Sequence, residues 1–390
     1  MITVIDAPCG TGKTTYCINY MKSNPNKKFI YITPFLSECE RVRKEVPNMF
    51  EPKRTDSGKY KNFVKLLSEG KNIVSTHALF QMCTKEMIDY IELYGYTLIL
   101  DEVMNVVEQL TLKKDDIPNL LNAELIKIED DGKIVWLKED NVSSYDDFKI
   151  KCMNESLYLI NGVVLFWVFP HDIFKSFRET YICTYMYDSQ IQRYYYDYFN
   201  IEYVKKTIKN GTLCEYEHQV SNLDKIHICE NEKINFIGDT KTALSKHWYY
   251  EKAKTGVKLL KNATYNFFRH IVKAKSKDII WTTFKDYRQK VSGEGYTKSF
   301  VPCNTRATNE YINRHNVAYL INCYINPYQI EFFRTKNIEI DQDLYALSEM
   351  LQFIYRSAVR NGEDINVYIP SQRMRNLLQS YISSNVLTNV

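Results

Sequence analysis

Residues Ala7 to Thr14 form a short segment that could hold a phosphate group. They read Ala-Pro-Cys-Gly-Thr-Gly-Lys-Thr, a Walker A sequence with Ala in place of its first Gly. Small residues let consecutive backbone N–H groups curl around a phosphate at the N-terminus of a helix. Lys13 then reaches the β- and γ-phosphates, and the Thr14 hydroxyl ligates Mg²⁺. The predicted nucleotide-binding residues of this loop are Gly10, Thr11, Gly12, Lys13, Thr14 and Thr15.

Two acidic residues, Asp101 and Glu102, directly follow the apolar run from Thr97 to Leu100. A Walker B acid is expected at the end of a buried strand that neighbours the phosphate loop. We expect Asp101 to support the Mg²⁺ of the nucleotide together with Thr14, and Glu102 to polarise the attacking water as general base. The two motifs together predict a protein that hydrolyses a nucleoside triphosphate and uses Mg²⁺.

Short apolar runs alternate with helical stretches in both halves of the chain. Strands that alternate with helices predict β-α-β units and parallel sheets, so the expected fold class is α/β. In the first half we expect strands at 2–5, 29–33, 73–76, 97–100, 163–169 and 181–185, with helices at 13–22 and 36–46. In the second half we expect strands at 278–284, 300–303, 317–324 and 365–369, with helices at 306–315, 343–360 and from 372.

The character of the chain changes near residues 195–205, which predicts one domain at 1–197 and another at 198–390. At 390 residues, two domains of ordinary size are the natural expectation. The tyrosine cluster 194–196 precedes the change, and core packing is its expected role.

The net charge of +4 conceals two stretches of opposite sign. Residues 101–150 carry 13 acidic and 6 basic side chains. An acidic insertion at about 105–155 is therefore expected to be a solvated, turn-rich decoration of the ATPase domain. Between 252 and 290 there are 11 Lys or Arg and 2 Asp or Glu, interleaved with aromatic residues such as Tyr265. This basic stretch predicts either contact with nucleic-acid phosphates and bases or a solvated helical face above a core-facing aromatic row.

Zinc sites and membrane spans are not indicated. The ten cysteines form no C-x-x-C pair and the seven histidines no H-x₃₋₅-H pair. The N-terminus lacks the basic region of a signal peptide. The longest apolar run, Gly162 to Pro170, is far shorter than the roughly 20 residues of a membrane span. We therefore expect a soluble, cytoplasmic protein with reduced thiols and no membrane partner.

The segment Asp101-Glu102-Val103-Met104 resembles the D-E-x-x box of superfamily-2 DNA/RNA helicases of the DEAD/DEAH-like type. Other segments resemble further motifs of that family in order: Tyr31–Leu36 with Glu38 and Arg41 motif Ia, Ser75–His77 the next strand-binding motif, Thr184-Tyr185 motif III, Trp281–Phe284 motif IV and Asn304–Asn309 motif V. The resemblance implies two tandem RecA-like P-loop NTPase domains with parallel sheets. It also implies nucleic-acid contacts at Thr33, Pro34, Thr76, His77, Thr283, Arg306 and Thr308.

The segment from Gln352 to Arg360 resembles motif VI of the same family. Gln352, Arg356 and Arg360 are spaced i, i+4 and i+8, which predicts that one helix face carries all three. The resemblance implies that they sense the γ-phosphate, and that one arginine neutralises charge that develops during phosphoryl transfer. The family usually has its second arginine at +7 rather than +8, so Arg360 is the favoured arginine finger and Arg356 the alternative.

The resemblance implies an ATP-dependent helicase or translocase that acts as a monomer on single- or double-stranded nucleic acid. The compact size and the Lys-, Ile-, Asn- and Tyr-rich composition resemble helicase-like proteins of low-GC bacteriophages. This favours DNA over RNA, a role in phage replication, recombination or repair with proteins of those processes as partners, and the cytoplasm of a bacterial host. The alternatives are a P-loop kinase, a packaging or remodelling ATPase that does not unwind strands, and a nucleotide-binding clamp without turnover.

Overall fold

The computed structural model describes residues 1–390 apart from 57, 112–114, 139–144, 304–309 and 387–390. The chain forms two compact units. The first consists of Met1–Ala7, Thr11–Glu217 and Asn326–Ile340, and the second of Pro8–Gly10, His218–Ile325 and Asp341–Val390. Each unit contains a mainly or wholly parallel sheet, so the predicted α/β class with parallel sheets is confirmed.

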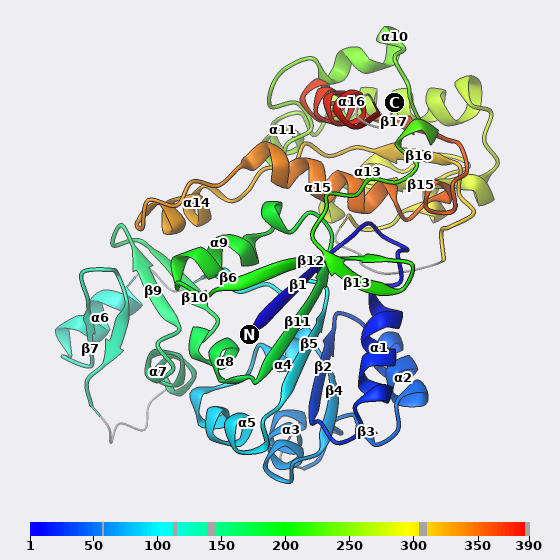
Figure 1. Ribbon diagram of the computed structural model, residues 1–390. Helices are drawn as coiled ribbons and strands as arrows, with labels where there is room; N and C mark the ends of the chain where they lie inside the picture. Colours follow the sequence, from blue (N-terminus) through cyan, green and yellow to red (C-terminus); the bar gives the residue numbers. More distant parts are fainter. Residues whose placement is uncertain (57, 112–114, 139–144, 304–309, 387–390) are drawn as a thin grey trace. The chain divides into compact units, whose positions relative to one another are not determined.

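The first unit is built on an eight-stranded sheet with the order β13-β12-β1-β11-β5-β2-β4-β3 (Figure 1). All neighbours are parallel except β12 and β13, which form an antiparallel hairpin at one edge. Its central strands are mainly apolar, as is usual for strands that are covered on both faces. The strands are β1 (Ile2–Asp6), β2 (Phe29–Thr33), β3 (Met49–Phe50), β4 (Asn72–Thr76), β5 (Thr97–Asp101), β11 (Glu179–Thr184), β12 (Tyr203–Lys209) and β13 (Thr212–Glu215).

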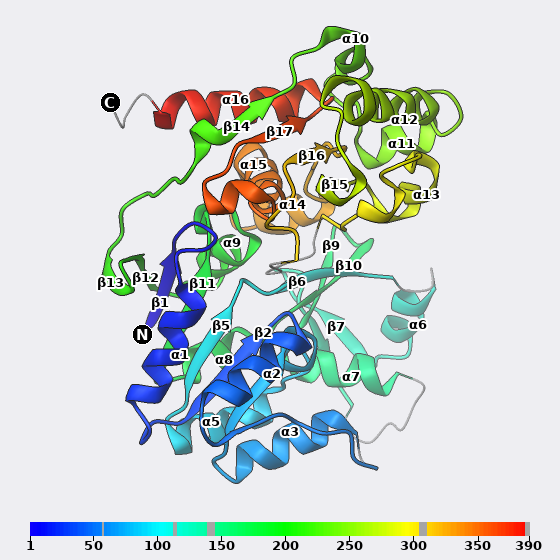
Figure 2. The ribbon, with the colours of Figure 1, turned by 90° about the vertical axis from the view of Figure 1, so that its right-hand side faces the viewer.

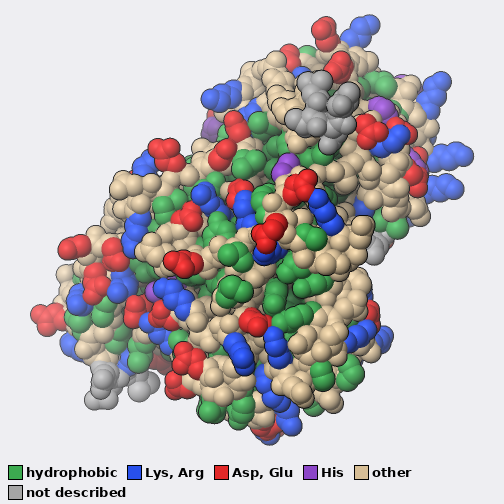
Figure 3. Space-filling view, viewed as in Figure 1, with side chains coloured by type: hydrophobic (Ala, Val, Ile, Leu, Met, Phe, Trp, Pro, Cys, Tyr) green, Lys and Arg blue, Asp and Glu red, His purple; other side chains and the backbone are tan. Residues whose placement is uncertain are grey.

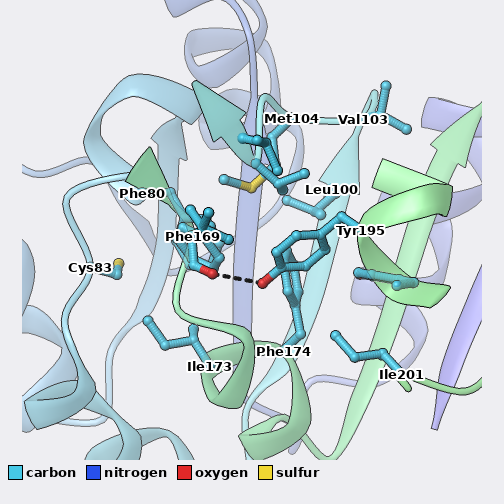
Figure 4. Close-up of a cluster of buried hydrophobic side chains, with 14 of the residues drawn as sticks. Phe80, Cys83, Leu100, Val103, Met104, Phe169, Ile173, Phe174, Tyr195 and Ile201 are labelled. Carbon is cyan, nitrogen blue, oxygen red and sulfur yellow. Dashed lines mark hydrogen bonds between the residues drawn. The ribbon is translucent and has the colours of Figure 1, made fainter. Parts of the chain in front are cut away.

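Helices cover both faces of this sheet. Successive side chains of a strand point to opposite faces, so each buried strand contributes to a core on both sides. In β2, Phe29 and Tyr31 pack in one buried cluster with α1 and α2, whereas Ile30 and Ile32 pack in another on the opposite face. The second cluster includes Phe169 and Tyr195, and the Tyr195 hydroxyl donates to the Phe169 carbonyl at 2.7 Å (Figure 4). The helices are α1 (Lys13–Ser23), α2 (Leu36–Glu45), α3 (Lys59–Ser68), α4 (His77–Phe80), α5 (Ile88–Tyr94), α8 (His171–Ser176) and α9 (Ile191–Tyr198).

The acidic insertion is more ordered than the sequence predicts. It lies within a folded subdomain of residues 107–168, called the insert below. In the insert, β6 (Val107–Leu110), β10 (Val164–Val168) and β9 (Leu157–Ile160) form an antiparallel sheet, and β7 (Ile126–Ile128) and β8 (Ile134–Trp136) form a hairpin. With α6 (Asp116–Asn122) and α7 (Asp146–Met153) they enclose a small core that includes Leu120, Ile126, Ile134 and Phe148. Figure 3 shows acidic side chains, interspersed with lysines, over this insert. The charged residues therefore cover a folded subdomain.

A segment from the second half of the chain completes the first unit. It contains α14 (Pro327–Arg334), whose Phe332 is fully buried and stacks on Tyr198 with the ring centroids 4.7 Å apart. The side-chain amide of Gln329 donates to the Val107 carbonyl of β6 at 3.1 Å. The segment 326–340 thus joins α9 and the insert in one core, although the second unit precedes and follows it in the sequence.

The second unit contains a wholly parallel sheet with the order β14-β17-β16-β15 (Figure 2). The strands are β14 (Ile226–Ile228), β17 (Ile365–Tyr368), β16 (Asn316–Tyr319) and β15 (Ile279–Thr282). Trp281 packs in a buried cluster with α11 and α12, whereas Tyr319 packs on Phe353 of α15, so both faces are covered. The helices are α10 (Glu232–Asn235), α11 (Lys246–Glu251), α12 (Gly256–Asn266), α13 (Arg288–Val291), α15 (Gln342–Ile354) and α16 (Gln372–Val386).

Three expected elements of the second half differ from the structure. The expected helix 306–315 is wrong in its described part, because residues 310–313 form turns. In place of a strand at 300–303 there is a single bridge between Trp281 and Phe300. The expected helix 343–360 ends early, at Ile354.

The predicted domain limits 1–197 and 198–390 stay a prediction. In the structure, β12 and β13 follow residue 198 in sequence and pair within the first sheet. The compact units change at Glu217 and His218 and again around the segment 326–340. The tyrosines 194–196 are buried in the core of the first unit, as the sequence predicts.

Replacing Phe332 by Ala should destabilise the first unit by about 3–5 kcal/mol, because it opens a cavity among Tyr158, Phe166 and Tyr198. Urea unfolding followed by circular dichroism measures the effect. The control is Tyr328→Ala on the same helix, where half of the side chain is exposed and the expected change is within about 0.5 kcal/mol. Equal stability of the two variants would contradict the assignment of this segment to the first core.

His315 should make the stability of the second unit depend on pH. Its Nδ1 lies 2.8 Å from Asp278 Oδ1 and its Nε2 lies 2.7 Å from Glu363 Oε2, and these hydrogen bonds raise the pKa of His315. A raised folded pKa contributes stability that is complete below the unfolded pKa and is lost as pH rises through the folded pKa.

The variant His315→Gln should therefore lower the melting temperature more at pH 6 than at pH 9. Thermal melts of both proteins at the two pH values test this, and an NMR titration of the imidazole measures its pKa directly. A loss of the same size at both pH values would show that the charge of His315 contributes nothing.

Candidate nucleotide site

The carboxyl ends of the first sheet bring the predicted chemical residues to one edge. The strand register pairs Asp6 with Thr184, Thr33 with Thr76, and Asp101 with Cys183. In open α/β sheets, ligands bind outside the carboxyl ends of the strands. This edge is therefore the candidate site of the first unit.

The phosphate loop has the backbone that its glycines require. Gly10 and Gly12 have φ angles of +92° and +88°, in the left-handed region that side chains rarely adopt. Gly12 is the residue that precedes α1, and no side chain caps the helix there. A Cβ atom at Gly12 would meet nothing within 4 Å, so backbone conformation and not space favours glycine. The first N–H groups of α1 are thus arranged as an anion site at a helix N-terminus requires.

Lys13 and Asp6 fix the two ends of the loop. Lys13 is buried, and its Nζ donates to the Ala7 carbonyl at 2.5 Å. The Ala7 N–H donates to the Thr184 carbonyl at 3.1 Å. The buried Asp6 carboxylate accepts from the backbone N–H groups of Met186 and Tyr187 at 2.8 and 3.0 Å, and burial raises the pKa of Asp6. The loop is therefore anchored to the segment that follows β11.

Asp101 is buried at the end of β5, and protein hydroxyls donate to both of its oxygens. Thr14 Oγ1 lies 3.0 Å from Oδ1 and the Tyr31 hydroxyl lies 2.9 Å from Oδ2. Burial raises the pKa of Asp101 to about 6, and the neighbouring Glu102 charge also raises it, whereas the two hydrogen bonds lower it. The two predicted Mg²⁺-binding residues are thus in direct contact.

The donor set fits Mg²⁺ bound with a nucleotide. A hydroxyl and a carboxylate are the hard oxygen donors that Mg²⁺ prefers, and this ion usually takes its other ligands from phosphates and water. Among the residues that the structure describes, no group of three His, Cys, Asp or Glu could hold a metal on its own. The chain therefore offers Thr14 and Asp101 as a partial Mg²⁺ site that substrate phosphates would complete.

Glu102 stands beside Asp101 in a strained backbone conformation. Its φ is +80°, which costs a residue with a side chain of the order of 1–3 kcal/mol. Its N–H donates to the Cys183 carbonyl at 2.9 Å. Two residues on, the Met104 N–H donates to the Gln192 side chain of α9 at 3.0 Å. These contacts hold the predicted general base at the strand end.

The predicted nucleic-acid-binding residues fall into three groups. Thr33, Pro34, Thr76 and His77 lie together at the ends of β2 and β4, where Thr33 is buried and the other three are half-buried. Thr283 is buried in the second unit and its hydroxyl donates to the Tyr249 hydroxyl at 2.9 Å. Arg306 and Thr308 lie outside the described residues.

The basic stretch divides into an exposed charged part and a buried aromatic part. Phe267, Phe268 and Trp281 are fully buried in the core of the second unit, whereas Tyr265 is half-buried. The exposed charged residues that lie before, along and after α12 are Lys252, Lys254, Lys258, Arg269, Lys273, Lys275 and Lys277. The aromatic residues thus face the core and the charged residues face solvent, as the alternative of a solvated helical face predicts.

The three motif VI residues do not share a helix face, so that prediction was wrong. Gln352 lies on α15, which ends at Ile354, and Arg360 lies on the 3₁₀ turn Ala358–Asn361. Arg356 is buried and donates to the carbonyls of Pro302 at 3.2 Å and Cys303 at 2.9 Å.

The backbone leaves the helix at Ser357, which is extended and whose hydroxyl donates to the Ile354 carbonyl at 2.6 Å. The side-chain nitrogen of Gln352 is buried without a hydrogen-bond partner in the described part of the chain. Arg360 is half-buried.

Sequence reasoning missed three side chains that hold this site. Asp6 and Tyr31 lie in strands that read as apolar, and Gln192 lies beside the tyrosine cluster. A polar residue inside a strand that is otherwise apolar was the available signal for Asp6 and Tyr31, because a buried polar group needs a partner. No local pattern marks Gln192.

All ten cysteines are free, and none of the helices in the described ranges has the length and apolar character to cross a bilayer. Cys17 of α1, the helix that follows the phosphate loop, lies close to Cys183 of β11, with their sulfur atoms 3.4 Å apart. The hydrogen bond with the Cys17 thiol, followed by burial, raises the pKa of Cys183 well above its usual range. This thiol pair is therefore packed as part of the core.

Solved structures give a comparison for the fold. The structure of S. tokodaii Xpd4 matches with a TM-score of 0.50 at 11% sequence identity, over 98% of this chain and 94% of that chain. At such identity the similarity shows the fold alone. The crystal structure of a hypothetical ATP-dependent RNA helicase from Sulfolobus tokodaii matches at 10% identity over 97% of this chain and 90% of that chain, but its TM-score of 0.27 is too low to support an argument.

Sequence comparisons match separate parts of the chain. Residues 107–167, which lie within the insert, match the YonV middle domain, and residues 220–382 match the YonV C-terminal Rossmann-like domain. The SPbeta prophage-derived uncharacterized protein YonV of Bacillus subtilis (strain 168) is 42% identical over 408 residues, which cover 98% of this chain and 99% of that protein. The chain therefore belongs to the YonV family.

Proposed function

We propose that this protein is an Mg²⁺-dependent ATP hydrolase that couples turnover to movement along nucleic acid, as superfamily-2 helicases and translocases do. The observation that carries the proposal is the contact between Thr14 of the phosphate loop and Asp101 at the end of β5, with Lys13 and Glu102 beside them. A phosphate loop alone serves many activities. A loop hydroxyl joined to a strand-end Asp-Glu pair is the arrangement that nucleotide hydrolysis needs.

Each residue has a defined task in this proposal. The N–H groups at the start of α1 and the Lys13 ammonium bind the β- and γ-phosphates, while Thr14 and Asp101 hold Mg²⁺. When bound, Mg²⁺ neutralises the charge that builds up on the phosphate oxygens. Glu102 orients the attacking water and accepts its proton. Gly10, Thr11, Gly12 and Thr15 complete the loop.

Residues of the second unit supply the γ-phosphate sensors in the proposal. The buried Gln352 amide without a partner in the described part of the chain supports its role as a hydrogen-bond donor to nucleotide. Arg356 already uses its guanidinium to hold the Pro302 and Cys303 carbonyls. Arg360 is the proposed arginine finger. Arg356 supports the turn between Gln352 and Arg360.

A nucleic-acid strand would pass along Thr33, Pro34, Thr76 and His77 of the first unit. Exposed lysines and arginines of the basic stretch would neutralise phosphates, which makes binding sensitive to salt. The proposed contacts also include Thr283, Arg306 and Thr308. The prophage origin of the YonV relative supports a phage-related role on DNA, in replication, recombination or repair, and we propose a monomer.

Lys13→Ala and Glu102→Gln should each lower ATP hydrolysis by at least about 100-fold, since a general base alone contributes 10²–10⁴-fold. The assay is phosphate release with and without single-stranded DNA or RNA, which should stimulate the unaltered protein. Lys22→Ala in the last turn of α1, a partly exposed residue, is the control and should keep full activity. Hydrolysis that no DNA or RNA stimulates would sink the motor proposal, and phosphate transfer to a small acceptor would favour a kinase.

Substitutions of Arg356 and Arg360 should have different effects on stability and on ATP hydrolysis. Arg360→Ala should lower stimulated hydrolysis about 10³-fold or more, as expected of an arginine finger. Arg356→Ala should also destabilise the second unit, because the carbonyls of Pro302 and Cys303 lose a charged donor. Full activity of Arg360→Ala would exclude this residue as the finger.

A further inference from the structure

The carboxylate of Asp101 has a hydrogen-bond donor that the phosphate loop does not provide. Thr14 approaches Oδ1 from α1, whereas Tyr31 approaches Oδ2 from β2, at 2.9 Å. β2 and β5 are direct neighbours in the sheet, and Tyr31 pairs with Ile99 two residues before Asp101. The sheet order, and not sequence proximity, brings this phenol to the metal-supporting acid.

The surroundings of Tyr31 give its hydroxyl a single role. The ring is fully buried in an apolar cluster with Cys17, Cys39 and Val42. The hydroxyl donates to Asp101 Oδ2 at 2.9 Å. A tyrosine in such a cluster would leave a buried polar group unsatisfied without Asp101.

We infer that Tyr31 is a positioning residue for Mg²⁺, an inference that rests on the proposed function of the site. Rotation of an aspartate about its last side-chain torsion is soft and roughly two-fold. Donors on both oxygens fix this rotation, so that Oδ1 stays beside Thr14 before nucleotide binds. Tyr31 acts through Asp101 and does not itself touch Mg²⁺ or substrate.

The expected consequence is a change in the Mg²⁺ requirement. Partners of metal-binding groups typically affect metal affinity by 10- to 100-fold when they are removed. In Tyr31→Phe the ring and its packing remain, and only the donor to Oδ2 is lost. A purely structural hydroxyl would instead alter stability and leave the Mg²⁺ requirement unchanged.

The test uses the full chain and the fluorescent nucleotide mant-ATP, titrated with Mg²⁺. In Tyr31→Phe the Mg²⁺ concentration for half-maximal binding should rise about 10- to 100-fold. The matched control is Tyr96→Phe, since this buried phenol of the same unit donates to the Lys71 carbonyl at 2.7 Å, away from the site. It should leave that concentration unchanged. Melting curves of both variants establish that they are folded.

A second comparison separates action through Asp101 from general damage. In an Asp101→Asn background, Tyr31→Phe should add no further change in the Mg²⁺ requirement. An unchanged Mg²⁺ requirement in Tyr31→Phe, or an equal shift in Tyr96→Phe, would overturn the inference. Failure of the unaltered protein to bind mant-ATP would overturn the proposed function, and the role of Tyr31 with it.

Discussion

The hydrogen bond between Thr14 and Asp101 joins the two halves of the candidate site. Thr14 lies in the first turn of α1, directly after the phosphate loop. Asp101 lies at the end of β5, which is two strands away from β1 in the sheet. Neither residue could bind a metal alone. Their contact requires β1 and β5 to lie on either side of β11, so the strand order of the whole first unit determines whether the site exists.

The end of β11 connects the parts of the site physically. The Cys183 carbonyl holds the Glu102 N–H, the Thr184 carbonyl holds the Ala7 N–H, and Asp6 holds the N–H groups that follow. The insert follows Glu102 within a few residues, and its two ends lie together, since the Phe169 N–H donates to the Val106 carbonyl at 2.9 Å. The segment 326–340 packs in the same core as β6, β9 and β10.

Local sequence was sufficient to predict the residues of the candidate nucleotide site. It was insufficient to predict the side chains that hydrogen-bond to them. The phosphate loop and the Asp-Glu pair were predicted because each depends on a few adjacent residues at the end of a strand. Tyr31 was not predicted as part of the site because its partner, 70 residues later, is chosen by sheet order. The contact of α14 with β6 joins residues more than 200 positions apart, beyond any local pattern.

Motif VI shows the same limit at the end of a helix. The apolar spacing of residues 343–354 predicted a helix, and α15 forms there. Its end depends on tertiary contacts, since Arg356 is drawn to the Pro302 and Cys303 carbonyls and Ser357 becomes extended. The helical spacing in the sequence continues past residue 354, although the helix ends there. It therefore wrongly placed Arg360 on the same helix face as Gln352.

A crystal structure with Mg²⁺ and a non-hydrolysable ATP analogue would test the central claim most directly. The account predicts Mg²⁺ at about 2.1 Å from the Thr14 hydroxyl oxygen, with Asp101 linked to the ion through a bound water and the phosphates against the N-terminus of α1. Nucleotide bound away from the phosphate loop, or Mg²⁺ without contact to Thr14, would contradict it.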